Sequence, residues 1–483
     1  GVQALLLRPL DRLDVELIAD LVARLAGAED DGAILVFVPG WQEIADVLRA
    51  LERRGRGEAW RLLPLHSAVP PEEQRRVFEP AKPGERKIVV ATNVAETSLT
   101  LEDVAHVIDS GLVRLVDFAP ETGVAALEHR LCARSSAVQR RGRAGRCRPG
   151  KVFRLYSRLE WEDNMPDNVL PEMQRTPVEE LCLQVRAVGL RGSIAGVLAA
   201  AMAPPPLAAV AGATASLRAL GALDDGDELT ALGLQLAALP MHPVLGKTLL
   251  LGSLFPCAPG ALAVCAALSG KPPFVAPFGQ ERDSDAAKRR AGAGLQSDHL
   301  LLARVSAQFG AMALEARAAW CRRTFLSERA MQLAEATRHD LRRHLRELRA
   351  VGPASARPCR GHEDEAEALG EEDDDEAWRA QMLAVLAGSL PLALRRPSER
   401  KFECLEASGA RCAVHPSSLL QHLSGAPGRR PGGERGPDCS VVCWFSRLRT
   451  SDTFLRDVSL LPDALPLLLF APRVRRRAAP QER

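Results

Sequence analysis

Three short apolar runs constrain the fold of this chain more than any other feature. Residues Ile34–Val38, Lys87–Ala91 and Val104–Ile108 each stop at small polar or turn-forming residues. Runs of this length with such boundaries predict strands buried on both faces. Apolar residues recur at helical spacing over 41–51, which predicts an amphipathic helix. Alternating strands and helices imply a parallel sheet, whose ligand-binding loops lie at the carboxyl ends of the strands.

From about Pro171 the pattern changes to long helical stretches rich in Ala and Leu. Residues 223–229 predict a tight hairpin that follows a helix, which is how a winged-helix module is built. A mainly helical region is therefore expected after the α/β region. Its predicted helices cover 178–188, 211–220, 243–254, 299–309 and 318–351.

The C-terminal part begins with an acidic run in which ten acids fall between Glu363 and Glu376. Like charges at this density repel one another and cannot be buried, which predicts a solvated linker. Short strand-like pieces follow, broken by a loop rich in Gly, Pro and Arg at 425–437. They predict a small β-barrel. The pieces are 382–387, 412–415, 441–445 and 465–470.

Composition is that of a soluble globular protein of several domains, with 483 residues and 46% hydrophobic content. The net charge of +2 says little about partners, because a basic groove can be offset by acidic segments elsewhere. None of the eleven cysteines forms a C-x-x-C pair, which favours reduced thiols over zinc and an intracellular location, nuclear or cytoplasmic. The longest apolar stretches are too short for a membrane span.

The segment Gln139–Arg146 carries the strongest chemical signal. Its arginines sit on a turn interrupted by glycine, so that planar guanidinium groups can reach a polyphosphate while the backbone stays close. A basic surface helix is the alternative interpretation. Upstream, Val90–Thr100 follows a predicted strand and is rich in small hydroxyl and amide side chains, which suit contacts with phosphate and sugar.

Together with Ile34–Gly40 and Leu65–Ser67, these segments closely resemble the second RecA-like domain of ATP-dependent RNA helicases of the DEAH/RHA family. Gln139 heads the arginine motif, where the DEAD-box relatives have His. The resemblance implies that Gln139 positions the water that attacks the γ-phosphate. It also implies that Arg143 and Arg146 are finger arginines, which neutralise charge in phosphoryl transfer.

The resemblance extends to nucleotide binding. Phe78 matches the phenylalanine that stacks on adenine, and Glu102 stands where the family usually has Asp near the ribose. Ser98 would sense the nucleotide and relay its state to the RNA, and Thr100 joins this predicted ATP-binding set.

For RNA, the resemblance implies that Gly40, Ser67, Thr92 and Asn93 contact the sugar-phosphate backbone of a single strand, without reading bases. Residues 114–131 correspond to the family's strand-separating hairpin, although alone they predict an ordinary surface hairpin.

The segment Gln296–His299 resembles the ratchet-domain segment that touches RNA, which adds Ser297, Asp298 and His299 to the predicted RNA contacts. Read as isolated residues, His299 and His415 would each be structural.

Further matches cover most of the remaining chain. Residues 175–181 resemble the winged-helix entry, 320–326 a ratchet-domain helix, and 415–418 and 449–457 the OB-fold. The segment Gly388–Ala393 lacks the aromatic residue of the family's strand, and Tyr156 is the only tyrosine of the chain, so RNA affinity should rest on phosphate contacts and depend on salt. The predicted domains are a second RecA-like domain at 1–168, a winged helix at 169–242, a ratchet domain at 243–360, an acidic linker at 361–377, an OB-fold at 378–472 and a basic tail at 473–483.

The phosphate loop, the Mg²⁺-binding acids and the Ser-Ala-Thr motif of a first RecA-like domain have no counterpart in the sequence. A phosphate loop would need a strand before it and a glycine at position 241, where this chain has Met241. Gly246-Lys247-Thr248 meets neither condition, so this segment is predicted to be structural. We therefore expect a first RecA-like domain to hold most of the ATP and Mg²⁺, and this chain alone neither to hydrolyse ATP nor to unwind RNA.

Two rival functions stay open: a truncated, catalytically silent RNA-binding or adaptor module, and a DNA-directed member of the same superfamily. An activator of the G-patch type is a possible further partner.

Overall fold

The computed structural model describes residues 13–461, except 28–31, 56–58, 67–68, 70, 98–99, 120–123, 148, 278, 349–375, 396–398, 400, 406–408, 425–439 and 451. The chain divides into two compact units. The first comprises 1–117, 127–172 and 276–281, and the second comprises 118–126, 173–275 and 282–483.

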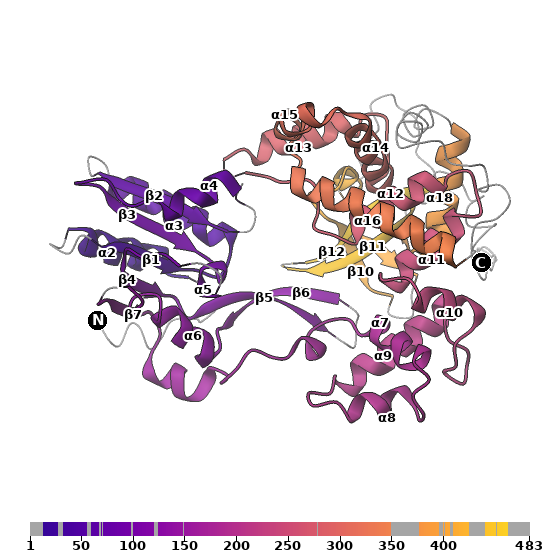
Figure 1. The fold of residues 1–483 in the computed structure, drawn as a ribbon, viewed down its shortest axis with the longest axis horizontal. Coiled ribbons are helices and arrows are strands. Elements are labelled where there is room, and N and C mark those ends of the chain that lie inside the picture. The colour runs from indigo at the N-terminus through magenta and orange to yellow at the C-terminus, as the bar shows by residue number, and fades with distance from the viewer. Residues whose placement is uncertain are drawn as a thin grey trace, which may run out of the picture. The chain divides into compact units, whose positions relative to one another are not determined.

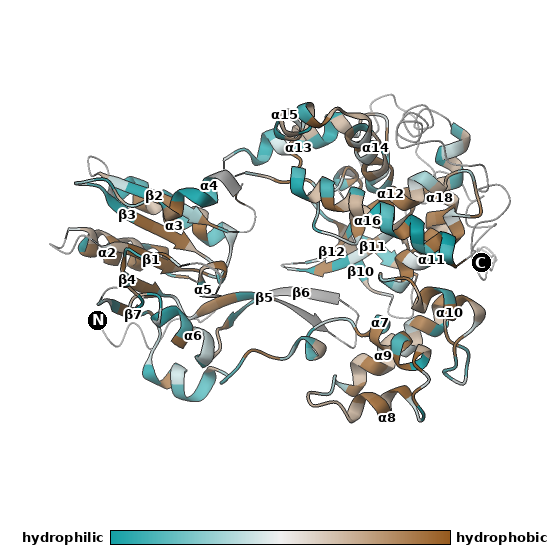
Figure 2. Cartoon of the chain, viewed as in Figure 1, coloured by the Kyte–Doolittle hydropathy of each residue, from teal (hydrophilic) through white to brown (hydrophobic). Residues whose placement is uncertain are grey.

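A five-stranded parallel sheet forms the centre of the first unit (Figure 1), in the order β2-β3-β1-β4-β7. The predicted parallel sheet is thus confirmed. Figure 2 shows the apolar residues concentrated in β1, β3 and β4, the inner strands whose apolar runs predicted them. The two edge strands are partly exposed and lack such runs. The strands are β1 (Ala33–Phe37), β2 (Trp60–Leu65), β3 (Arg86–Ala91), β4 (Val104–Asp109) and β7 (Lys151–Arg154).

Helices α2 (Val15–Ala26) and α3 (Trp41–Arg54) cover one face of this sheet, where Ile18 and Ile44 pack with Ile34. A separate apolar cluster covers the other face, including Ala95 of α5 (Val94–Thr97). Burial on both faces explains why the inner strands are apolar throughout. The remaining elements of this region are α4 (Pro71–Arg75), η1 (Arg76–Phe78), α6 (Arg134–Arg141), η2 (Glu160–Asn164) and η3 (Glu172–Gln174).

The predicted hairpin at 114–131 forms the neighbouring strands β5 (Leu112–Ala119) and β6 (Val124–Leu131). Its turn at 120–123 lies outside the described residues.

The second unit begins with four helices that form the predicted winged-helix region: α7 (Glu179–Ala187), α8 (Ile194–Ala199), α9 (Leu207–Leu220) and α10 (Ala231–Ala237). Gly221 ends α9 at φ 84, a left-handed conformation that glycine adopts without strain. An antiparallel bridge between Leu223 and Leu229 then closes the predicted tight hairpin.

Six helices follow between residues 243 and 348 of the described chain, and one prediction for them is wrong. Residues 318–351 were expected to be continuously helical, but Phe325 adopts φ 56 and breaks the segment, and Ser327 caps the next helix. No described helix is long and apolar enough to cross a membrane. The helices are α11 (Pro243–Gly252), α12 (Ala258–Leu268), α13 (Glu281–Ala291), α14 (Asp298–Ala311), α15 (Leu314–Thr324) and α16 (Glu328–Glu347).

A closed five-stranded barrel confirms the predicted β-barrel. Its strands pair in the cyclic order β8-β9-β10-β12-β11, and β10 and β12 form its parallel pair. The 3₁₀ turn η4 (Gln421–Ser424) follows β10. The strands are β8 (Leu392–Arg395), β9 (Phe402–Cys404), β10 (Arg411–Val414), β11 (Ser440–Arg449) and β12 (Thr453–Leu461).

Residues 382–387, predicted as a strand, instead belong to helix α18 (Glu376–Ser389). Trp378, Met382, Val385 and Leu386 recur at helical spacing and are all buried in one apolar cluster. The predicted strand at 465–470, most of the acidic linker and the basic tail lie outside the described residues.

Candidate functional site

Three predicted RNA contacts lie at one edge of the parallel sheet. Gly40 follows β1, and Thr92 and Asn93 follow β3. The backbone N–H of Thr92 donates to the carbonyl of Leu65, the last residue of β2, at 3.3 Å. Parallel pairing of β2, β3 and β1 therefore brings these residues together. Asn93 is exposed, whereas Gly40 and Thr92 are buried, and Ser67 lies outside the described residues.

The arginine motif is divided by the helical phase of α6. Arg140 is 1% exposed, and its Nη1 donates to Oδ1 of Asp109 at 2.8 Å, while its Nε lies 3.3 Å from Oε2 of Glu96. Its guanidinium also lies over the ring of Phe37, 5.1 Å from the centroid. Arg140 therefore joins α6 to β4, α5 and β1. The sequence analysis missed this role, although Ser136, Ala137 and Arg140 recur at the spacing of a buried helical face.

The other polar side chains of the motif are less buried than Arg140. Gln139, Arg141 and Arg146 are exposed, and Arg143 is half-buried. Burial, and then the like charge of Arg146, lower the pKa of Arg143. Two neighbouring guanidinium groups favour a multiply charged anion, because it can bind both cations at once.

Glycine packing holds the turn that carries these arginines. A methyl group on Gly150 would lie 2.0 Å from the carbonyl oxygen of Ala144 and 2.6 Å from that of Ala105 in β4. The turn at 142–145 therefore packs directly on backbone, a contact that only glycine permits. In the sequence, nothing apart from the glycine itself indicates that Gly150 packs against the arginine motif.

Phe78, the predicted adenine contact, is 48% exposed at the end of η1. A partly buried arginine and a buried lysine hold the backbone around it. Arg61 donates to the carbonyl of Arg76 at 3.2 Å, and Lys87 donates to the carbonyl of Glu79 at 3.1 Å. Lys87 also pairs with Asp103 at 3.0 Å.

Of the remaining predicted ATP contacts, Thr100 and Glu102 are exposed, whereas Ser98 lies outside the described residues. Phe78, Thr100 and Glu102 are therefore accessible to a ligand.

The three predicted RNA contacts of the second unit are buried. Ser297, Asp298 and His299 are 1%, 4% and 0% exposed. They form the start of α14, where Oγ of Ser297 accepts from the N–H of Leu300 at 2.9 Å. In the described structure these side chains do not line an open surface, and their contact with RNA stays a prediction.

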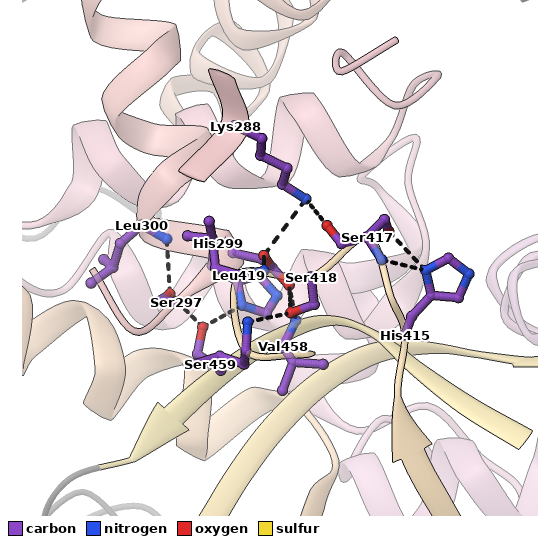
Figure 3. Close-up of polar contacts among 12 residues, drawn as sticks. Lys288, Ser297, His299, Leu300, His415, Ser417, Ser418, Leu419, Val458 and Ser459 are labelled. Atoms are coloured by element: carbon purple, nitrogen blue, oxygen red, sulfur yellow. Dashed lines mark hydrogen bonds and ion pairs between the residues drawn. The ribbon is translucent and has the colours of Figure 1, made fainter. Parts of the chain in front are cut away.

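Asp298 binds the barrel instead (Figure 3). Its Oδ2 accepts from Oγ of Ser418 at 2.5 Å and from the N–H of Val458 at 3.1 Å. Its Oδ1 accepts from the N–H of Leu419 at 2.9 Å, and Lys288 lies 3.7 Å away. One carboxylate thus connects α13, α14, β12 and the loop after β10.

His299 and Ser297 complete this contact through Ser459 of β12. Nδ1 of His299 lies 2.6 Å from Oγ of Ser459, which lies 2.5 Å from Oγ of Ser297 (Figure 3). Burial lowers the pKa of His299 to about 4, so the imidazole is neutral near pH 7. We call Ser297, Asp298, His299 and Ser459 the α14 clamp. They explain the burial physically, because Ser297, Asp298 and Nδ1 of His299 find partners in the barrel, whereas Nε2 of His299 is buried without one among the described residues.

His415 braces the barrel nearby. Its Nδ1 accepts from the N–H of Ser417 at 3.1 Å, and its ring meets the edge of the Phe454 ring at 5.6 Å. Burial, followed by the charges of Arg456 and Lys288, lowers its pKa to about 4. These contacts favour the structural interpretation of His415.

The Gly246-Lys247-Thr248 segment lies inside α11, with no strand before it. Nζ of Lys247 donates to the carbonyl of Leu220 at 3.1 Å, and burial lowers the pKa of Lys247. The structural interpretation of this segment is thus confirmed. In the described part of the chain, no group of three or more His, Cys, Asp or Glu side chains could hold a metal ion.

Three protein-family models match the chain. The helicase conserved C-terminal domain matches residues 15–148. The winged-helix part of the helicase-associated domain HA2 matches 213–241, and its ratchet-like part matches 242–302. These segments contain the arginine turn, the wing hairpin and the start of α14, respectively.

Similar proteins carry helicase names. The ATP-dependent DNA/RNA helicase DHX36 of Mus musculus is 42% identical over 292 residues, which are 60% of this chain and 29% of the relative. The DExH-box ATP-dependent RNA helicase DExH1 of Arabidopsis thaliana is 40% identical over 294 residues, again 60% and 29%. A protein of Mycosarcoma maydis named as a DEAH-box ATP-dependent helicase is 35% identical over 496 residues, which are 93% of this chain and 30% of the relative.

The chain spans about 30% of the length of these relatives. Matches to three consecutive helicase domains agree with the parallel sheet, the winged-helix region and the helices that follow it. The chain carries the domains of the C-terminal half of DEAH/RHA-family helicases, and it belongs to that family.

Proposed function

We propose that this chain completes the ATP site of an ATP-dependent RNA helicase. Arg143 and Arg146 supply the guanidinium groups that stabilise charge on the transferred γ-phosphoryl group, and Gln139 orients the attacking water. The observation that carries the proposal is the division of the arginine motif. Buried Arg140 fixes the turn to the sheet, while Gln139 and Arg146 stay exposed.

A first RecA-like domain would hold most of the nucleotide and its Mg²⁺, and would be a direct partner of this chain. From this side, Phe78 would stack on the adenine, and Thr100 and Glu102 would face the nucleotide together with Ser98. The exposure of Phe78, held by backbone bonds from Arg61 and Lys87, supports this assignment. Closure of the two RecA-like domains on ATP would move single-stranded RNA past the carboxyl ends of the β-strands.

The barrel supports a further assignment as an OB-fold. Its cyclic strand order with a parallel β10–β12 pair fits a five-stranded Greek-key barrel of this type. The winged-helix and barrel surfaces would then be available to RNA or to an activator of the G-patch type.

The sharpest test supplies a first RecA-like domain as a separate protein. Mixing the chain with a separately made first RecA-like domain should produce RNA-stimulated ATPase activity, and Arg143→Ala or Arg146→Ala should lower kcat by about 10³-fold. Arg141→Ala is the matched control, because Arg141 is an exposed arginine at the end of α6, just before the turn that carries Arg143 and Arg146. Equal activity of all three variants would exclude the finger assignment.

A catalytically silent RNA-binding or adaptor module is the second candidate. It predicts RNA binding by the chain but no ATPase activity after mixing. Because one relative is named a DNA/RNA helicase, competition between RNA and single-stranded DNA should accompany the assay. Preference for DNA would favour the DNA-directed alternative.

A further inference from the structure

Arg114 of β5 lies against Gly40 at the end of β1. A methyl group placed on Gly40 would lie 3.1 Å from Cδ and 3.5 Å from Nη1 of Arg114. The aliphatic part of this half-buried arginine therefore covers the glycine, and packing restrains its guanidinium group. Arg114 was not among the residues that the sequence predicted to bind RNA.

One N–H group of the Arg114 side chain lacks an acceptor among the described residues. Its Nε is buried and has no hydrogen-bond partner among them. Such a donor costs free energy unless a ligand or another group satisfies it. An anion beside Gly40 would meet the same guanidinium group from the side of Nη1, which lies 3.5 Å from a methyl group placed on Gly40.

Glu43 is the acid nearest to a methyl group placed on Gly40. Its Oε2 would lie 2.8 Å from a methyl group on Gly40, and it too is buried without a hydrogen-bond partner. Its Oε1 lies 3.0 Å from Nε2 of His129 in β6. Glu43 is therefore held by His129 and leaves the buried Nε of Arg114 unsatisfied.

The backbone adds a second preference for an anion. Gly40 is the N-cap of the 14-residue helix α3 and provides no side-chain hydrogen bond to the first turn. The N–H groups of a first turn carry partial positive charge and favour anions. Thr92 and Asn93 lie at the end of the neighbouring strand, so the same edge of the sheet offers further polar groups.

We propose that Arg114 binds a phosphodiester group of single-stranded RNA beside Gly40, and that Glu43 opposes this binding by its negative charge. The inference rests on the proposed RNA-binding function and adds a residue to it. Arg114 acts as a phosphate ligand and reads no base. Its contribution should therefore be independent of RNA sequence and should weaken with salt.

The test measures the affinity of the full 483-residue chain for a fluorescent oligouridylate across a series of salt concentrations. Arg114→Gln should weaken binding about tenfold and reduce the slope of log K against log salt by about 0.7, the value for one phosphate on a single strand. Arg114→Lys should keep the slope, because it keeps the charge. Glu43→Gln should strengthen binding severalfold.

Arg49→Gln is the control, since Arg49 is an exposed arginine further along α3 that pairs with Asp46 at 3.1 Å. Binding by Arg114→Gln with the affinity and slope of Arg49→Gln would overturn the inference while leaving RNA binding intact. If the wild-type chain failed to bind RNA, the proposed function and this inference would both fall. Should Arg114→Gln fold poorly, Arg114→Lys and Glu43→Gln still test the proposal. Unchanged RNA affinity of Glu43→Gln, together with a reduced salt slope of Arg114→Lys, would contradict it.

Discussion

The arginine motif Gln139–Arg146 is predicted to meet a nucleotide and the Ser297–His299 part of the α14 clamp to meet RNA, yet the two use their polar side chains in opposite ways. In the arginine motif, Arg140 faces inward and pairs with Asp109, while Gln139 and Arg146 stay exposed. In the clamp, Ser297, Asp298 and His299 all face the barrel. Resemblance to a motif therefore identifies residue types, whereas accessibility decides which of them can meet a ligand.

Replacement of Arg140 should have the largest effect on stability. Arg140→Met leaves Asp109 and Glu96 buried near each other without their cation, and breaking such a pair costs about 3–5 kcal/mol. Arg141→Met, at the exposed neighbour, should change the free energy of unfolding by less than about 0.5 kcal/mol. Denaturant unfolding followed by circular dichroism checks both variants. Equal stability would mean that Arg140 is not the anchor of the turn.

The same contrast explains what the sequence could and could not predict. The inner strands were predictable because burial on both faces makes them apolar throughout, as at Ile34–Val38. Edge strands such as β7 carry exposed residues and lack this signal. Residues 382–387 were assigned to a strand because their apolar content was read without the helical spacing that continues from Trp378.

The candidate site divides along similar lines. The arginine motif is local, so its residues could be named from one segment. The clamp joins Asp298 to Ser418 and Val458, which are 120 and 160 residues away. No local pattern encodes such pairings, because they depend on how the barrel packs against α14. The partners of Asp298 and His299 could therefore not be foreseen from Gln296–His299, although His299 read alone predicts a structural role.

Acid should weaken the clamp before it affects the arginines. The pKa of His299 is about 4 in the folded chain and about 6.5 when unfolded. Between these values the unfolded chain binds a proton that the folded chain rejects, so stability decreases as pH falls from about 6.5 to about 4. The full effect is about 3 kcal/mol in the second unit. Unfolding measured by denaturant at several pH values should reveal this loss.

His299→Asn isolates the clamp histidine, because asparagine keeps a polar group near Ser459 and does not titrate. His415 acts in the same direction, and Asp457, whose pKa is raised by burial, acts in the opposite one. Only the difference between wild type and His299→Asn is therefore assigned to His299. A wild-type pH profile identical to that of the variant would contradict a neutral, buried His299.

Replacement of Lys247 should have the smallest effect on stability. It lies in a phosphate-loop-like segment, but its ammonium group donates to the carbonyl of Leu220 and burial lowers its pKa. Lys247→Met keeps most of the aliphatic stem and removes one hydrogen bond, so it should cost about 1 kcal/mol of stability. Accessibility also predicts unchanged ATPase activity in the assembly with a first RecA-like domain, in contrast to Arg146→Ala. A large loss of ATPase activity without unfolding would mean that a buried lysine serves the nucleotide, and the accessibility rule drawn from the arginine turn and the α14 clamp would fail.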